Sequence, residues 1–192
     1  AFWARPNENV SDNVPLISNS SFEAEPSSSN YGYGWNIRLV GGEIEIAFAK
    51  RYPAYAAILR TRSAKIRADE WRHVSVSFTG RKEDDNAYTP ASRFRIHIDG
   101  EEVRTIVRHD GLQDFPKKMD RSTSFGSDYF SNGDQFEGSL DEIQQFDRAL
   151  SPDEIRSLFE HQALSHIIAK AGRAEPVLQN ADRLSQREHN RI

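Results

Sequence analysis

The sequence predicts an all-β protein, an antiparallel β-sandwich of jelly-roll type, followed by a C-terminal helical tail. Short segments alternate apolar and polar residues, as in Phe94, Ile96 and Ile98, which is typical of strands with one buried and one solvent-facing side. Turn-forming pairs, Gly41–Gly42 and Asp99–Gly100, separate such segments. Composition then changes near residue 150, since all 3 Trp, all 6 Tyr and 10 of the 11 Phe precede it.

The strongest strand patterns are short and are separated by polar loops. They cover residues 35–39, 44–48, 74–78 and 94–98, with loops expected at 18–33, 81–90 and 112–120. The helical tail begins with Ser151, Pro152 and Glu154, a capping-box signature. A second amphipathic stretch is predicted at 175–187. We therefore expect a sandwich over 1–150 and a helical extension over 151–192, which would begin the next domain or act as a linker.

The start of the chain indicates a piece of a longer protein. It opens on Ala1 without Met or a signal peptide, and Phe2 and Trp3 resemble the interior of a strand. We expect the first strand or strands of the sandwich to lie upstream.

Overall composition excludes several classes of function. The 192 residues carry a net charge of −4, which disfavours a nucleic-acid-binding surface. No run of apolar residues is long enough to span a membrane. There are no cysteines, which excludes disulfides, zinc–thiolate sites and thiol catalysis.

Four segments together resemble laminin G-like, concanavalin A-like jelly-roll domains. Residues 70–80 (EWRHVSVSFTG) are similar to the family's "W-x-H-V-x-V-T-Y-D-G" strand, and 95–100 (RIHIDG) to its "L-Y-V-D-G" hairpin. Residues 136–143 (FEGSLDEI) and 146–155 (FDRALSPDEI) are similar to the closing "F-x-G-x-I-D-E-V" and "Y-N-R-A-L-S-x-E-E-I" motifs. The resemblance covers about residues 1–160 and implies the jelly-roll fold.

Further segments resemble a subgroup of these domains that lies inside large secreted bacterial proteins. The segments are 34–37 (GWNI), 51–53 (RYP) and 58–61 (ILRT). Such proteins also carry cytochrome-c-like domains. The resemblance implies an extracellular or periplasmic location and contacts with other domains of a parent chain.

Asp141 is the candidate metal ligand. In many concanavalin A-like folds a structural calcium ion ties the first and last strands through one carboxylate and several carbonyls, and Asp141 matches that carboxylate. The alternative is that Asp141 bonds a neighbouring loop or pairs with Arg148.

Aromatic residues in predicted loops are the candidate sugar-binding platforms. Pyranose C–H faces pack against aromatic rings, and neighbouring glycines let a ligand approach closely. The alternative is that these rings hold loops against the sandwich. The candidates are Tyr31, Tyr33, Tyr52, Tyr55, Tyr129 and the adjacent Phe130.

A jelly-roll glycoside hydrolase is the weaker alternative. Glu43 and Glu45 lie two apart on one strand and share a face, as carboxylates of retaining glucanases do. The segment lacks the central Asp and the third acid of that pattern. A solvated strand face beside Arg38 is the plainer interpretation.

The histidines and the basic residues suggest no catalytic arrangement. His73 and His97 fall on the polar, solvent-facing side of their strands, and no pair of histidines has metal-binding helical spacing. A basic cluster could meet an anionic polysaccharide, although a charged strand edge that prevents aggregation is the simpler interpretation. The cluster consists of Arg60, Arg62, Lys65 and Arg67.

These observations favour a non-catalytic carbohydrate-binding or adhesion module. The main alternative is a protein-interaction or spacer module without affinity for glycans, since fold alone does not separate the two.

Overall fold

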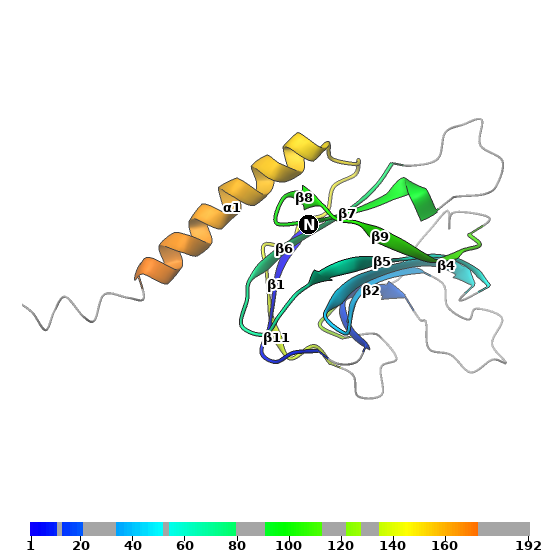
Figure 1. Cartoon of the computed structure of the whole chain (residues 1–192), viewed down its shortest axis with the longest axis horizontal. Coiled ribbons are helices and arrows are strands. Elements are labelled where there is room, and N and C mark those ends of the chain that lie inside the picture. The colour runs from blue at the N-terminus through cyan, green and yellow to red at the C-terminus, as the bar shows by residue number, and fades with distance from the viewer. Residues whose placement is uncertain are drawn as a thin grey trace, which may run out of the picture.

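The computed structural model describes residues 1–10, 13–20, 34–51, 54–79, 91–112, 122–127 and 135–172, with side chains omitted at 51 and 165–172. Within these ranges two antiparallel sheets form a sandwich and one helix follows it (Figure 1). This confirms the predicted jelly-roll class. Within the same ranges, no helix combines the length and apolar character needed to cross a bilayer.

The five-stranded sheet, called sheet A, has the order β11-β1-β6-β7-β8. Its strand β1 lies second from one edge, paired antiparallel with both β6 and the edge strand β11. This side of the sheet therefore joins the start of the chain to its last strand. The bounds are β1 Phe2–Pro6, β6 Arg72–Phe78, β7 Phe94–Ile98, β8 Glu101–Glu102 and β11 Gly138–Asp141, with a 3-10 turn η1 at Ala91–Arg93.

The six-stranded sheet, called sheet B, has the order β10-β2-β3-β4-β5-β9. Strands β4 and β5 at its middle are the longest. The bounds are β2 Asn13–Ser20, β3 Gly34–Val40, β4 Glu43–Arg51, β5 Tyr55–Lys65, β9 Thr105–Asp110 and β10 Ser124–Phe125.

The predicted tight turns are confirmed. Gly41 and Gly42 connect β3 to β4 with φ of 59° and 83°, and Asp99 and Gly100 connect β7 to β8 with φ of 52° and 81°. Two successive positive φ values match the twist of a two-residue hairpin. Asp99 also anchors its hairpin, since its Oδ1 accepts a hydrogen bond from the His73 amide at 3.0 Å.

The main core lies between the two sheets. Alternate residues face inward, so Ile44 and Ile46 of β4 meet Phe94 and Ile96 of β7 in one buried cluster. This arrangement follows from the period of two along a strand.

Helix α1, Pro152–Gly172, begins as the capping box predicts. The Glu154 amide donates to Ser151 Oγ at 3.3 Å and the Ser151 amide donates to Glu154 Oε2 at 2.8 Å. The helix packs on the outer face of sheet A, beside β8 (Figure 1). The predicted 175–187 stretch lies outside the described residues.

Candidate functional site

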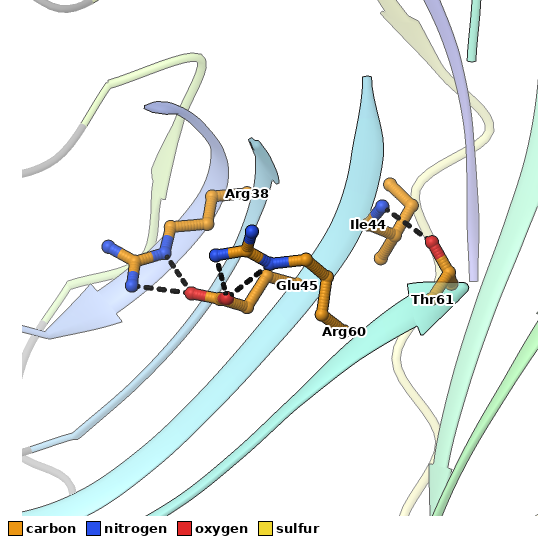
Figure 2. Close-up of polar contacts among 5 residues, drawn as sticks. All are labelled: Arg38, Ile44, Glu45, Arg60 and Thr61. Carbon is orange, nitrogen blue, oxygen red and sulfur yellow. Dashed lines mark hydrogen bonds and ion pairs between the residues drawn. The ribbon is translucent and has the colours of Figure 1, made fainter. Parts of the chain in front are cut away.

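The outer face of sheet B carries a buried charged cluster at its centre. Glu45 on β4 lies opposite Arg38 on β3 and Arg60 on β5 in the strand register. Arg38 Nε and Nη2 donate to Glu45 Oε1 at 2.9 and 2.6 Å (Figure 2). Arg60 Nε and Nη2 lie 2.7 and 2.6 Å from Glu45 Oε2. Both oxygens of one carboxylate are therefore held by two guanidinium groups.

The three side chains of this cluster are buried to different extents. The Glu45 side chain is 3 % exposed, whereas Arg38 is 14 % and Arg60 25 % exposed. The two arginines cover the carboxylate and present their own outer edges to the surface. The prediction that Glu45 lies on a solvated face is therefore wrong, because alternation does not reveal what a long cross-strand neighbour covers.

An irregularity in the ladder sets this register. Between Glu43 and Glu45 the pairing of β4 with β5 shifts, and Ser63 takes a positive φ of 67°. Thr61 compensates, since its Oγ1 accepts a hydrogen bond from the Ile44 amide at 3.0 Å (Figure 2). A bulge at this point places Arg60 directly opposite Glu45.

Arg60 was predicted to lie on a charged strand edge, and this is also wrong. Strand β5 lies between β4 and β9, so it is not an edge strand. The edge is β9, where Ile106 pairs with Arg60 and is 39 % exposed. A partly exposed guanidinium and an exposed aliphatic side chain thus lie side by side.

Beside the charged cluster, a row of polar and apolar residues lines the same face. One register row crosses five strands of the sheet, and its central members are buried. The Oδ1 of Asn36 in this row is buried and has no hydrogen-bond partner. The row consists of Ser18, Asn36, Ala47, Ile58 and His109.

The glucanase alternative finds no support in the geometry of Glu43 and Glu45. Glu45 is committed to two arginines, and Glu43 Oε1 accepts a hydrogen bond from the Ser63 amide at 2.9 Å. A glycosidase needs one carboxylic acid free to give up its proton and one carboxylate facing the substrate. Neither described residue meets that requirement.

A separate apolar cavity of about 750 Å³ lies between the two sheets. Its walls are inward side chains such as Ile37, Phe48 and Phe78, and Phe125 and Phe146 at its lining are 53 % and 42 % exposed. Among its described lining residues Asp147 is the only carboxylate. The described lining thus supplies one carboxylate, whereas hydrolysis of a glycosidic bond uses a pair of acids.

Among the predicted aromatic platforms, the structure describes Tyr55 only. It is the first residue of β5, opposite Arg51, and is 37 % exposed. Its partial exposure is compatible with ligand contact. The other candidates, Tyr31, Tyr33, Tyr52, Tyr129 and Phe130, lie outside the described residues.

Asp141 ends strand β11, opposite Trp3 of β1. Its Oδ1 accepts a hydrogen bond from the Glu142 amide at 2.8 Å, and Arg148 forms its ion pair with Glu154 at 2.7 Å. In the part of the chain that the structure describes, no three His, Cys, Asp or Glu side chains gather to hold a metal ion. Asp141 itself would supply one carboxylate, whereas calcium takes six to eight oxygens.

His73 and His97 do not face solvent, contrary to the prediction. Both are buried on the outer face of sheet A, where Phe159 of α1 packs against the His73 ring. Burial lowers the pKa of His73 from 6.5 to about 4, helped by the nearby Ala1 amino group and His97, and burial also lowers the pKa of His97. The sequence alternation identified the correct face, but it contained no signal that a helix covers it.

Solved structures of similar fold are found among toxin domains. The binding domain of Paraclostridial Mosquitocidal Protein 1 matches with a TM-score of 0.53 and 17 % identity, over 82 % of this chain and 35 % of that one. An HCR/D mutant matches with a TM-score of 0.51 and 18 % identity, over 84 % and 36 %. The receptor binding domain of botulinum neurotoxin D has a TM-score of 0.48 and 17 % identity, over 84 % and 36 %. At such identities the first two matches show the fold alone. This chain spans about a third of each of the three structures.

Among curated proteins there is no significant match. A laminin G family model, described as the concanavalin A-like lectin/glucanases superfamily, matches residues 1–156. That range takes in all eleven strands and the start of α1. The chain belongs to this laminin G family of concanavalin A-like domains.

Proposed function

We propose that this domain binds carbohydrate without cleaving it, through the outer face of sheet B. The observation that carries the proposal is the pair of guanidinium groups that one buried carboxylate holds in place. Glu45 fixes Arg38 and Arg60 through four close contacts, so both are pre-oriented before any ligand arrives. Oriented planar donors suit the vicinal hydroxyls of a sugar.

Arg60 is the residue that we expect to contact the ligand. Its Nε and Nη2 serve Glu45, which leaves Nη1 to donate outward. Ile106 beside it offers an aliphatic surface for the C–H face of a sugar ring. A polar donor next to an apolar patch is a common composition of small-ligand sites.

The family description supports carbohydrate as the ligand class, because lectins and glucanases both bind sugars. Hydrolysis is disfavoured by the commitments of Glu43 and Glu45. The toxin binding domains of similar fold are consistent with a binding module, although they show the fold alone.

The test is native affinity electrophoresis through neutral and sulfated polysaccharides. We expect retardation by at least one polymer class, and loss of most of it in Arg60→Met. The matched control is Arg156→Met, which removes an exposed arginine from α1 on the opposite side of the sandwich. Free migration of the parent chain through every gel would contradict the proposal and favour a protein-interaction or spacer role.

Calcium at Asp141 is proposed as a structural aid to this binding. Asp141 would supply the carboxylate, and the other oxygens would have to come from backbone carbonyls and water. The same gels run with calcium and with chelator test it. Unchanged migration of both the parent chain and Asp141→Asn would rule out this role.

We further propose that the domain works outside the cytoplasm, within a larger protein. The subgroup resemblance of residues 34–37, 51–53 and 58–61 supports this location. Fractionation of cells that produce the parent protein would test it, and recovery in the cytoplasm would contradict it.

A further inference from the structure

Helix α1 is held on sheet A by a small aromatic cluster with a histidine at its centre. The His73 ring lies 5.4 Å from Trp3 and 5.9 Å from Phe159, and Trp3 and Phe159 stack at 5.7 Å, between ring centroids. Trp3 Nε1 donates to Gln162 Oε1 at 3.0 Å. Ile155 is fully buried at the start of the same helix face. The cluster therefore joins strands β1 and β6 to the helix.

The histidines beneath the helix lack hydrogen-bond partners. His73 is 0 % and His97 2 % exposed, and none of their four ring nitrogens is hydrogen-bonded. Buried polar groups in native proteins are nearly always paired. Burying a neutral imidazole in such a site costs less free energy than burying a protonated imidazolium, which would be a charge without a counterion.

Among the described residues no acidic side chain is hydrogen-bonded to the His73 ring, and Asp99 accepts a hydrogen bond from the main-chain amide of His73 instead. On α1, Phe159 lies against the His73 ring and Gln162 accepts a hydrogen bond from the neighbouring Trp3, and both residues are uncharged. Burial lowers the pKa of the Ala1 amino group, just before β1, from 8.0 to about 6, so this group adds positive charge mainly below pH 6. His97 of β7 also adds positive charge when it is protonated. Nearby Arg72 is bound to Asp99 and to Glu70, so it leaves no acidic group free for His73.

The surroundings of His97 are mixed. Glu101 and Glu102 on β8 favour its protonation, whereas burial and Arg95 oppose it, and burial is the larger effect. Glu101 is also bound to Arg156 of α1 at 3.1 Å. His97 therefore supports the effect of His73 more weakly. The other charged side chains on the described part of α1 are exposed, namely Asp153, Glu154, Glu160 and His161.

We propose that α1 is a pH-released cover: protonation of His73, assisted by His97, detaches the helix from sheet A while the sandwich stays folded. Release would expose Trp3 and the apolar side of α1. The Arg38–Glu45–Arg60 cluster lies on the other sheet and would remain intact. The proposal does not depend on carbohydrate binding.

The direction and size of the effect follow from proton linkage. The pKa of His73 is about 4 in the docked state, against 6.5 for an exposed histidine. Docking is therefore fully favoured above pH 6.5 and weakens as the pH falls from 6.5 to 4, since the released state binds the proton better. For this one group, the ratio of released to docked helix rises about 20-fold between pH 7 and pH 5.

Hydrogen–deuterium exchange of the full chain tests this, because protection factors detect release even when it is rare. After correction for the intrinsic pH dependence of exchange, we expect protection of residues 153–164 to fall about 20-fold from pH 7 to pH 5. Strands β4 and β5 should keep their protection. A fall of less than about threefold, or an equal fall in β4 and β5, would overturn the proposal.

Two variants identify the titrating group. His73→Leu removes the proton site and should keep α1 protected at pH 5; His73→Met replaces it if the Leu variant folds poorly. His161→Leu is the matched control, since His161 lies exposed on α1 and should leave the pH response unchanged. A fall as large in the His73 variant as in the parent chain would overturn the assignment.

Discussion

Polar residues on the outer faces of the two sheets are buried in different ways. On sheet A, polar strand positions such as His73 are buried beneath a helix among aromatic rings and remain neutral. On sheet B, the equivalent position Glu45 is buried beneath two arginine side chains that form ion pairs with its carboxylate. The outer face of sheet A is covered by a packed helix, whereas Glu45 on the outer face of sheet B is covered by side chains of the neighbouring strands.

This difference shows that a non-core strand position can be buried in more than one way. A helix that covers a face removes water and counterions together, so a titratable group there is sensitive to pH. An ion cluster keeps partial access to water and offers hydrogen-bond donors to a ligand. The first arrangement suits a conformational response, and the second suits binding.

The largest expected effect comes from breaking the charged cluster on sheet B. Glu45→Ala would leave two partly buried guanidinium groups facing each other, and we expect a loss of about 3 kcal/mol in the free energy of unfolding. This loss in the free energy of unfolding is at the low end for buried ion pairs because both arginines reach solvent. Urea denaturation measures it, with Glu43→Ala as the control. Equal stability of the two variants would show that the cluster is dispensable.

The matching substitution at the sheet A face, in α1, should weaken the docking of α1 without destabilising the sandwich. Ile155→Ala removes a fully buried side chain from α1, and we expect docking to weaken by about 2 kcal/mol. Hydrogen exchange would then show faster exchange over residues 153–164 with β4 and β5 unchanged. Loss of protection throughout the sandwich would mean that the covered face is part of the cooperative core.

A smaller effect is expected at the start of the helix. Ser151→Ala removes the Oγ that accepts a hydrogen bond from the Glu154 amide, which should cost about 1 kcal/mol of helix stability. Thermal unfolding followed at 222 nm measures the change. Ser157→Ala, at an exposed position inside α1, is the control and should have no comparable effect.

The smallest expected effect is the loss of the helix cap at low pH, in a pH range that differs from that of the His73 response. The Arg148 ion pair, with the Ser151 amide, lowers the pKa of Glu154 from 4.5 to about 2. The cap contribution is therefore present above pH 4.5 and lost as the pH falls toward 2, below the range in which His73 titrates. Carboxyl chemical shifts of Glu154 against pH would show this, and a midpoint near 4.5 would contradict it.

Much of the fold was predictable because it depends on local chemistry. The hairpins at Gly41–Gly42 and Asp99–Gly100 follow from residues that accept positive φ, and the capping box at Ser151 follows from side chains three residues apart. The candidate site was less accessible. Arg38, Glu45 and Arg60 are separated in sequence, and a bulge between Glu43 and Glu45 sets their register.

The sequence by itself determined which strand residues point away from the core, where the chain turns and where the helix begins. These features depend on residues that are near one another in sequence, because strand periodicity and helix capping act over a few positions. Only the tertiary structure decided what those residues meet. That α1 covers His73, and that two arginines cover Glu45, depends on which elements pack together across tens of residues. Long-range packing sets the burial and the partners of a side chain, and these decide its charge and the chemistry that it can perform.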